Sequence, residues 1–319
     1  MKEMPGASRA DPEAGQQQLR DGTRERVATS SFDLAERLRS CAMVKKLDNT
    51  ELSGCDVLQI DVTNMAIWKS EVNKDLLVDL FGKLSIIVFR GGEYSSWDLE
   101  NPETRKKAIT DLNEVLESNK IFVVMKEGRA VGFASVLISE DLQGLKIAEG
   151  KLIVVDPDLR KSGVGKELNK LFFELDVDVL SAISQEPGAV SNWIKTAKKM
   201  DLISYFCGQR GGKLGEVGDE TEQDIVSKCE ELIRRSYEFE YPGRVIEGPG
   251  IVGIKRTNIK EEIQPPDPLT ADDLKFASDD PLKEIFENFV IKQNENHAPH
   301  TMYGVLLVLK SLPKVVEAD

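Results

Sequence analysis

An apolar segment followed at once by a glycine-containing turn constrains this chain more than any other feature. The segment Leu152–Val155 is apolar, Asp156-Pro157 ends it, and the run Arg160-Lys-Ser-Gly-Val-Gly165 leads into a helix-like sequence. Short apolar runs bounded by turn residues are typical of buried strands. The stretch from Ile147 to Asp176 therefore predicts a buried strand, a short turn and a helix entered through glycines.

The turn has the properties of an anion site. N–H groups at the start of a helix have no acceptor within the helix, and the helix dipole adds partial positive charge there. Gly163 and Gly165 lack a Cβ, so an oxyanion can approach the backbone closely. Three cations, Arg160, Lys161 and Lys166, lie around the turn in an otherwise acidic chain. We therefore expect it to bind a diphosphate.

The turn resembles the acetyl-CoA motif of the GNAT superfamily of N-acetyltransferases, which reads Arg or Gln, two free positions, Gly, one free position, then Gly or Ala. Arg160, Gly163 and Gly165 match it, and residues 121–125 and 130–138 are similar to the hairpin that precedes it in GNAT proteins. The resemblance spans about residues 66–206 and one late strand. It implies a GNAT acyl-CoA N-acyltransferase fold of α/β (α+β) class, with a mixed central sheet flanked by helices.

The resemblance also implies where acetyl-CoA binds. The cosubstrate would lie in a splayed gap between the strand at 147–155 and the next strand, near 177–184, with pantetheine on the strand backbone and pyrophosphate on the turn. The expected cofactor-binding residues are Ile153, Val154, Val155, Arg160, Lys161, Ser162, Gly163, Val164, Gly165 and Lys166.

Two rival nucleotide sites fail on spacing. A P-loop requires Gly, four residues and Gly-Lys-Ser/Thr, and the sequence contains no such string. A Rossmann fingerprint requires a third glycine, and Gly163-Val-Gly165 is followed by Lys-Glu-Leu. A tight strand-to-helix turn without a ligand stays open as an alternative.

A carboxylate, Glu149, lies on the strand that leads into the turn. The acceptor amine must be neutral to attack a thioester, yet a lysine amine titrates near about 10.4, so a base is required. In the histone-acetyltransferase branch of the family a Glu has this role fourteen residues before the first motif glycine, and Glu149 precedes Gly163 by the same spacing. We expect Glu149 to be the general base; a solvent-facing strand glutamate is the alternative.

The general acid is less clear from the sequence. Many GNAT proteins protonate the leaving CoA thiolate with a Tyr on a later helix, and alignment of Lys199–Leu202 with the family string places Ala197 there and Asp201 in place of a glycine. Tyr205, on an expected strand, is the substitute candidate. A strand tyrosine that only packs is the alternative.

Charge and composition limit the partners. A net charge of −13 and a pI near 4.9 argue against nucleic acid and anionic membranes, and are compatible with a cationic amine. Four scattered cysteines and two histidines predict no metal site. No apolar run approaches about 20 residues and no apolar signal core is found, so we expect a cytoplasmic protein without a membrane segment. A homodimer stays open.

The expected organisation has three parts. Residues 1–30 form a disordered tail, residues 31–257 the GNAT domain, and residues 258–319 an acidic C-terminal extension. Within the domain we expect a core at about 56–206, helices at 71–84 and 102–118 over the amine side, an insertion at 208–249, and a final strand at 250–256. The predicted function is acetyl transfer from acetyl-CoA to a primary amine, of a small molecule or a peptide. A non-catalytic acyl-CoA-binding or protein-interaction module is the alternative.

Overall fold

The structure is a computed structural model, and it describes residues 42–48, 52–70, 102, 117–127, 129–140, 144–156, 159, 162–240, 245–248, 250–254, 269–274, 276, 280–296 and 301–310. The tail expected at 1–30 and the helix expected at 71–84 lie outside these residues, and the helix expected at 102–118 lies almost wholly outside them. Those expectations remain predictions.

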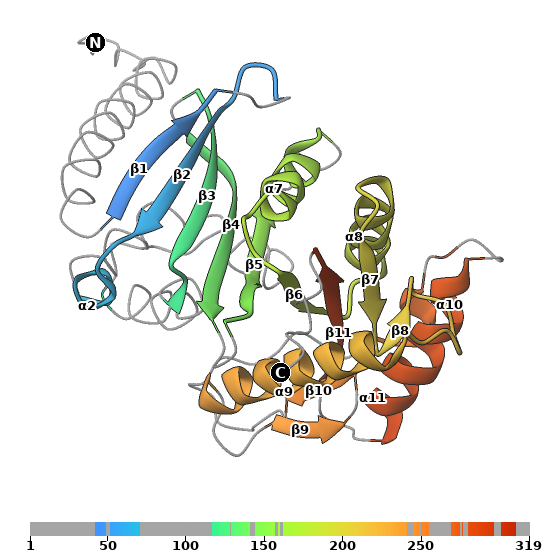
Figure 1. The fold of residues 1–319 in the computed structure, drawn as a ribbon. Helices are drawn as coiled ribbons and strands as arrows, with labels where there is room; N and C mark the ends of the chain where they lie inside the picture. The colour runs from blue at the N-terminus through green and yellow to red at the C-terminus, as the bar shows by residue number, and fades with distance from the viewer. Residues whose placement is uncertain are drawn as a thin grey trace, which may run out of the picture.

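Within the described residues, one mixed sheet contains all the strands (Figure 1). They are β1 (Ala42–Leu47), β2 (Asp56–Val62), β3 (Lys120–Lys126), β4 (Arg129–Glu140), β5 (Lys146–Val155), β6 (Val179–Ser184), β7 (Ile203–Phe206), β8 (Gln209–Arg210), β9 (Val245–Gly248), β10 (Ile251–Ile254) and β11 (Thr301–Leu309). Their order is β1-β2-β3-β4-β5-β6-β11-β10-β9, with β7 also beside β11 and β8 beside β7. The β5–β6 pair is parallel and the other pairs are antiparallel, which confirms the expected α+β class with a mixed sheet.

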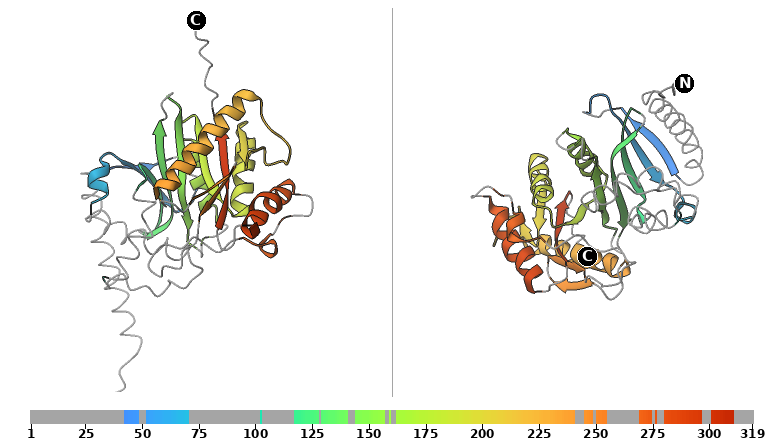
Figure 2. Two further views of the ribbon diagram at one scale, coloured as in Figure 1. Left: turned by 90° about the horizontal axis from the view of Figure 1, so that it is seen from below. Right: turned by 180° about the vertical axis from the view of Figure 1, so that it is seen from behind.

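Different helices cover the two faces of the sheet. They are α2 (Met65–Trp68), α7 (Val164–Phe173), α8 (Pro187–Lys199), α9 (Glu220–Glu240), η3 (Ala271–Asp273), α10 (Pro281–Ile285), the π-helix η4 (Phe286–Ile291) and α11 (Lys292–Asn296). Helices α7, α8, α10 and η4 pack on one face, in a core that includes Ala148, Leu180 and Val308. Helix α9 crosses the other face diagonally (Figure 2).

Helix α9 belongs to the segment that the sequence marked as an insertion. Its apolar side chains recur at helical spacing, at Ile225, Cys229, Ile233 and Tyr237, and all four are buried against strand residues of β5, β6, β7 and β11. The helix is thus an integral layer of the fold.

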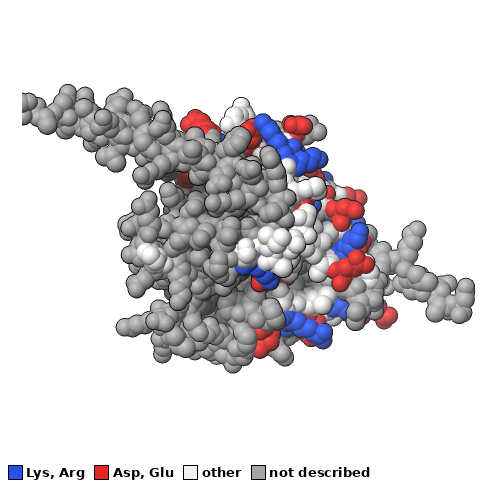
Figure 3. All heavy atoms as spheres, turned by 90° about the vertical axis from the view of Figure 1, so that its left-hand side faces the viewer, with Lys and Arg blue, Asp and Glu red and all other residues white. Residues whose placement is uncertain are grey.

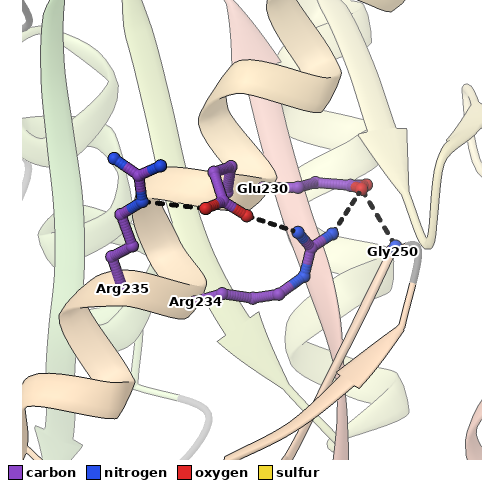
Figure 4. A network of polar contacts seen from close by, with 5 residues as sticks. Glu230, Arg234, Arg235 and Gly250 are labelled. Carbon is purple, nitrogen blue, oxygen red and sulfur yellow. Dashed lines mark hydrogen bonds and ion pairs between the residues drawn. The ribbon is translucent and has the colours of Figure 1, made fainter.

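A polar contact fixes α9 to the start of β10 (Figure 4). The Gly250 N–H donates to Glu230 Oε2 at 2.9 Å, and Arg234 lies 3.4 Å from the same oxygen. Burial of the carboxyl raises the pKa of Glu230, and these two partners oppose that effect.

The late strands correct one expectation. The segment expected as the final strand at 250–256 is present as β10, but it is not the last strand of the sheet. The strand between β6 and β7 is β11, which lies in the region expected to be an appended extension. Every residue of β11 is buried, as in a strand covered on both faces, so this region supplies part of the central core.

The outer edge of the sheet exposes both charged and apolar side chains, the latter including Met43 and Val44 of β1. On the described part of the face nearest β1, acidic and basic side chains are interspersed (Figure 3). Lys46 pairs with Asp56 at 2.7 Å, and Lys120 with Asp61 at 2.9 Å.

No helix among the described residues combines the length and apolarity needed to cross a membrane.

Candidate functional site

Strands β5 and β6 separate halfway along β5. They pair only from Ile147 to Gly150 on β5 and from Val179 to Ala182 on β6. Beyond Gly150, β5 continues beside β4 to Val155, and no described strand pairs with its other edge. Parallel strands that part at their carboxyl ends form a crevice typical of ligand sites. The splayed gap expected from the sequence lies here.

A β-bulge marks the point where the strands part. Val136 of β4 lies opposite Gly150, whereas Ser135 lies opposite Leu152, so Lys151 is the extra residue. A bulge locally increases the twist of a strand and bends it, and bulges are frequent beside active sites. The bulge thus lies directly after the last residue of β5 that pairs with β6.

Helix α7 begins at the open end of this gap. Its N-cap, Gly163, has φ 97°, a left-handed conformation that favours glycine, and no side chain caps the helix. The first helical hydrogen bond runs from Glu167 N–H to Gly163 O at 2.9 Å. The N–H groups of Val164 and Gly165 precede that bond, so they have no acceptor inside the helix. Just before them, Ser162 Oγ donates to Leu159 O at 2.6 Å and so shapes the turn.

A glycine on β4 allows α7 to lie close to the sheet. A Cβ on Gly132 would lie 2.7 Å from Val164 Cγ1 and 3.2 Å from the carbonyl oxygen of Val154. Both distances are below ordinary van der Waals contact, so a larger residue would push the first turn of α7 outward. The glycine therefore sets the position of the candidate anion site relative to β5.

Glu149 lies under α9 and is already paired. Its side chain is 10 % exposed, and its Oε1 lies 2.9 Å from Nζ of Lys151, whose side chain is fully buried. The same Nζ donates to Ser236 Oγ of α9 at 3.0 Å and lies 5.0 Å from the centre of the Tyr237 ring. Glu149 therefore does not face solvent as an ordinary strand glutamate would.

Tyr205 belongs to a separate polar cluster. Its hydroxyl donates to Glu222 of α9, and Arg210 lies 3.2 Å from the other oxygen of that carboxylate. Burial, together with the hydrogen bond and the negative charge of Glu222, raises the pKa of Tyr205 well above its usual value.

The sheet register separates Tyr205 from Glu149. Glu149 lies opposite Ser181, Ser181 opposite Leu307, and Leu307 opposite Tyr205. The two residues are thus in one row but three strand spacings apart, about 14 Å between backbones. The structure does not bring the expected base and acid together.

The position expected for the family's acid is apolar. Ala197 belongs to α8 and is fully buried in the core. Asp201, which replaces a family glycine, has φ 57° and follows the end of α8, where Leu202 N–H donates to Ala197 O at 2.9 Å. This is a Schellman helix end, in which the residue after the cap is left-handed, so Asp201 fills a glycine position.

The other expected cofactor residues fall in three parts of the chain. Ile153, Val154 and Val155 lie on the part of β5 beyond the bulge, and Val154 is fully buried. Lys166 lies exposed in the first turn of α7. Arg160 and Lys161 lie outside the described residues.

Sequence reasoning missed Lys151 and Ser236. Lys151 is two residues from Glu149, and side chains at that spacing share a face of a strand. The sequence could therefore have predicted that the two side chains are neighbours. Ser236 is 85 residues from Lys151 in the chain, and no local pattern could join them.

One comparison with known proteins, that with protein families, agrees with the expected family. Residues 90–175 match the acetyltransferase (GNAT) family. The chain is similar to a putative acetyltransferase from Pyrococcus horikoshii (12 % identity over 83 % of this chain and 93 % of that one, TM-score 0.37). It is also similar to diaminobutyrate acetyltransferase from Paenibacillus lautus (14 % identity over 40 % of this chain and 76 % of that one, TM-score 0.27). A third similar structure is an acetyltransferase from Trypanosoma brucei (16 % identity over 49 % of this chain and 90 % of that one, TM-score 0.26). The comparison with curated proteins gives no match. The family match confirms the GNAT resemblance, and with it the GNAT type of fold.

Proposed function

We propose that this GNAT-type chain is an N-acetyltransferase that transfers an acetyl group from acetyl-CoA to a primary amine. The observation that carries the proposal is the parting of β5 and β6 beyond Gly150, directly before the uncapped first turn of α7. The gap offers an open strand edge for an extended pantetheine chain. The turn offers main-chain N–H groups for a diphosphate.

The residues of this region fit the cosubstrate. Ile153, Val154 and Val155 present the open edge of β5, and Gly163 and Gly165 leave space beside the backbone because neither has a Cβ. Ser162, Val164 and Lys166 complete the turn, and Arg160 and Lys161 add positive charge in the sequence. Acetyl-CoA would supply an acyl group already activated as a thioester.

Glu149 is the proposed general base. Acetyl transfer requires the acceptor ammonium to lose a proton before its nitrogen attacks the thioester carbon, and the C–S bond then breaks as the thiolate leaves. A carboxylate at the edge of the gap can take that proton. Ala197 carries no acidic group and Tyr205 lies too far from Glu149, so we assign no protein acid to the thiolate.

A second candidate function is a non-catalytic acyl-CoA-binding module. Two observations favour it: Ala197 at the position expected for the acid, and an ammonium, that of Lys151, already on Glu149. Such a protein would bind the cosubstrate and leave it intact.

Two measurements separate these functions. Calorimetric titration with CoA tests the binding site, and release of free thiol from acetyl-CoA tests turnover with spermidine, kanamycin, n-butylamine and a lysine-containing peptide as acceptors. An acetyltransferase binds CoA and releases thiol with at least one amine class. Binding without amine-dependent release supports the module, and absence of binding rejects both.

A further inference from the structure

Glu149 is held by a buried lysine, Lys151, that neither the family pattern nor the proposed reaction requires. Lys151 Nζ connects two elements: it lies 2.9 Å from Glu149 Oε1 on β5 and 3.0 Å from Ser236 Oγ on α9. The side chain of Lys151 is fully buried. An ammonium in that setting is retained only with close, well-placed partners, because removing it from water is costly.

Glu149 and Lys151 lie on one face of β5. Side chains two residues apart share a face of a strand, and the 2.9 Å ion pair shows that these two still do so where the register shifts at position 151. The ring of Tyr237, whose centre is 5.0 Å from Nζ, adds a cation–π contact from the same helix. Helix α9 thus contacts Lys151 through both a hydroxyl and an aromatic ring.

The pairing also leaves one carboxylate oxygen available. Oε1 of Glu149 lies against Lys151, whereas no hydrogen bond to Oε2 occurs among the described residues. A carboxylate held at one oxygen samples fewer rotamers, so the direction of its second oxygen varies less. A proton acceptor that is fixed before the substrate arrives is more effective than a mobile one.

We infer that Lys151 is a positioning residue for Glu149, and that α9 holds it there through Ser236, so the insertion at 208–249 completes the acceptor side of the site. This inference rests on the proposed acetyltransferase function. Under this inference the insertion contributes to catalysis in addition to covering one face of the sheet.

The test is a double-mutant cycle with acetyl-CoA and the amine of the panel that is turned over fastest. We expect Lys151→Met to lower kcat by about 10- to 100-fold, because a misdirected base loses its alignment, with KM for acetyl-CoA nearly unchanged. In a Glu149→Gln background, Lys151→Met is expected to cause no further loss. Non-additivity of this kind identifies a residue that acts through Glu149.

Controls separate positioning from stability. Lys151→Arg keeps the charge and is expected to restore part of kcat. Lys228→Met removes an exposed ion pair with Asp224 on the same helix and is expected to leave kcat unchanged. Ser236→Ala removes only the hydroxyl that α9 offers and is expected to lower kcat by a few-fold; it decides the question if Lys151→Met does not fold.

Each outcome bears on the inference. Equal losses from Lys151→Met in the wild-type and Glu149→Gln backgrounds overturn it, as does a Ser236→Ala variant with wild-type kcat. Failure of the proposed function is visible separately, because the wild-type protein would then show no amine-dependent thiol release, and the positioning role falls with it.

Discussion

Both helix-covered faces of the sheet are mainly apolar, but they differ in the polar groups that they hold. Toward α7 and α8 the strands present apolar side chains, including Ala134, Val136, Ala148 and Leu180, and a glycine at position 132 admits the helix. Toward α9 they present an apolar cluster that includes Ile147 and Leu307, and with it Glu149, Lys151 and Tyr205, each bonded to a polar partner. The first face allows a close helix approach, and the second adds paired polar groups to an apolar core.

This contrast predicts that substitutions on the two faces have separable effects. Changes on the α7 face should move α7 and so alter stability and CoA affinity together. Changes near Glu149 on the α9 face should alter the rate with CoA affinity preserved.

The largest effect is expected for Glu149→Gln. Glutamine keeps the size of the side chain but cannot accept a proton, so the rate of acetyl transfer should fall by about 10²- to 10⁴-fold. CoA affinity, measured by calorimetry, should remain at the wild-type value because the diphosphate site lies at α7. An unchanged rate across the pH range would remove Glu149 from the mechanism.

Gly132→Ala tests the other face. The added methyl group would meet Val164 Cγ1 at 2.7 Å, and relief of that overlap should cost about 1–3 kcal/mol in the free energy of unfolding. We expect CoA affinity to fall as well, because the first turn of α7 shifts. Denaturant unfolding and calorimetry measure the two effects.

The compensating change is Val164→Ala, which removes the overlapping methyl group. The double variant should recover part of both the stability and the CoA affinity lost by Gly132→Ala. If Gly132→Ala instead lowered kcat with stability and affinity intact, the division between the faces would be wrong.

Tyr205 tests whether every polar group on the α9 face acts in catalysis. Because Tyr205 lies three strands from Glu149, Tyr205→Phe should change kcat by less than about 2-fold, while loss of the bond to Glu222 should cost about 1–3 kcal/mol of stability. A loss of kcat comparable to that of Glu149→Gln would restore Tyr205 as the acid.

The ionisation of Tyr205 gives a spectroscopic test of the same cluster. Its folded-state pKa is raised, so its stabilising contribution is complete below about pH 10, the unfolded value, and is lost as pH rises through the folded value. Absorbance titration of the phenolate should show one tyrosine that resists ionisation in the wild type. Glu222→Gln should lower its pKa, because a negative charge beside the phenol is removed.

Local signals in the sequence predicted much of the fold. The strand β5 and the glycine turn into α7 follow from an apolar run and turn residues, whereas the hairpin of β3 and β4 and the strand β6 were expected from the GNAT resemblance. The role given to Glu149 came from the same resemblance and stays a prediction. The place of β11 could not be predicted, because which strands become neighbours depends on contacts between distant segments. The contact of Ser236 with Lys151 is hidden for the same reason. Strand β1 was missed because most of its side chains are exposed and lack an apolar alternation.

The smallest expected effect is on the α7 face, at the end of α8. Asp201 adopts φ 57°, a conformation that costs a residue with a Cβ about 1–2 kcal/mol, whereas glycine adopts it freely. Part of that gain is offset because glycine has more freedom in the unfolded chain, so Asp201→Gly should stabilise the fold by about 0.5 kcal/mol. Denaturant unfolding would measure it, and Asp201→Ala is the matched control, expected to destabilise. Because the end of α8 is exposed and lies on the face of the sheet opposite to Glu149, kcat should stay at the wild-type value; a change in rate would mean that the packing face also controls the chemistry.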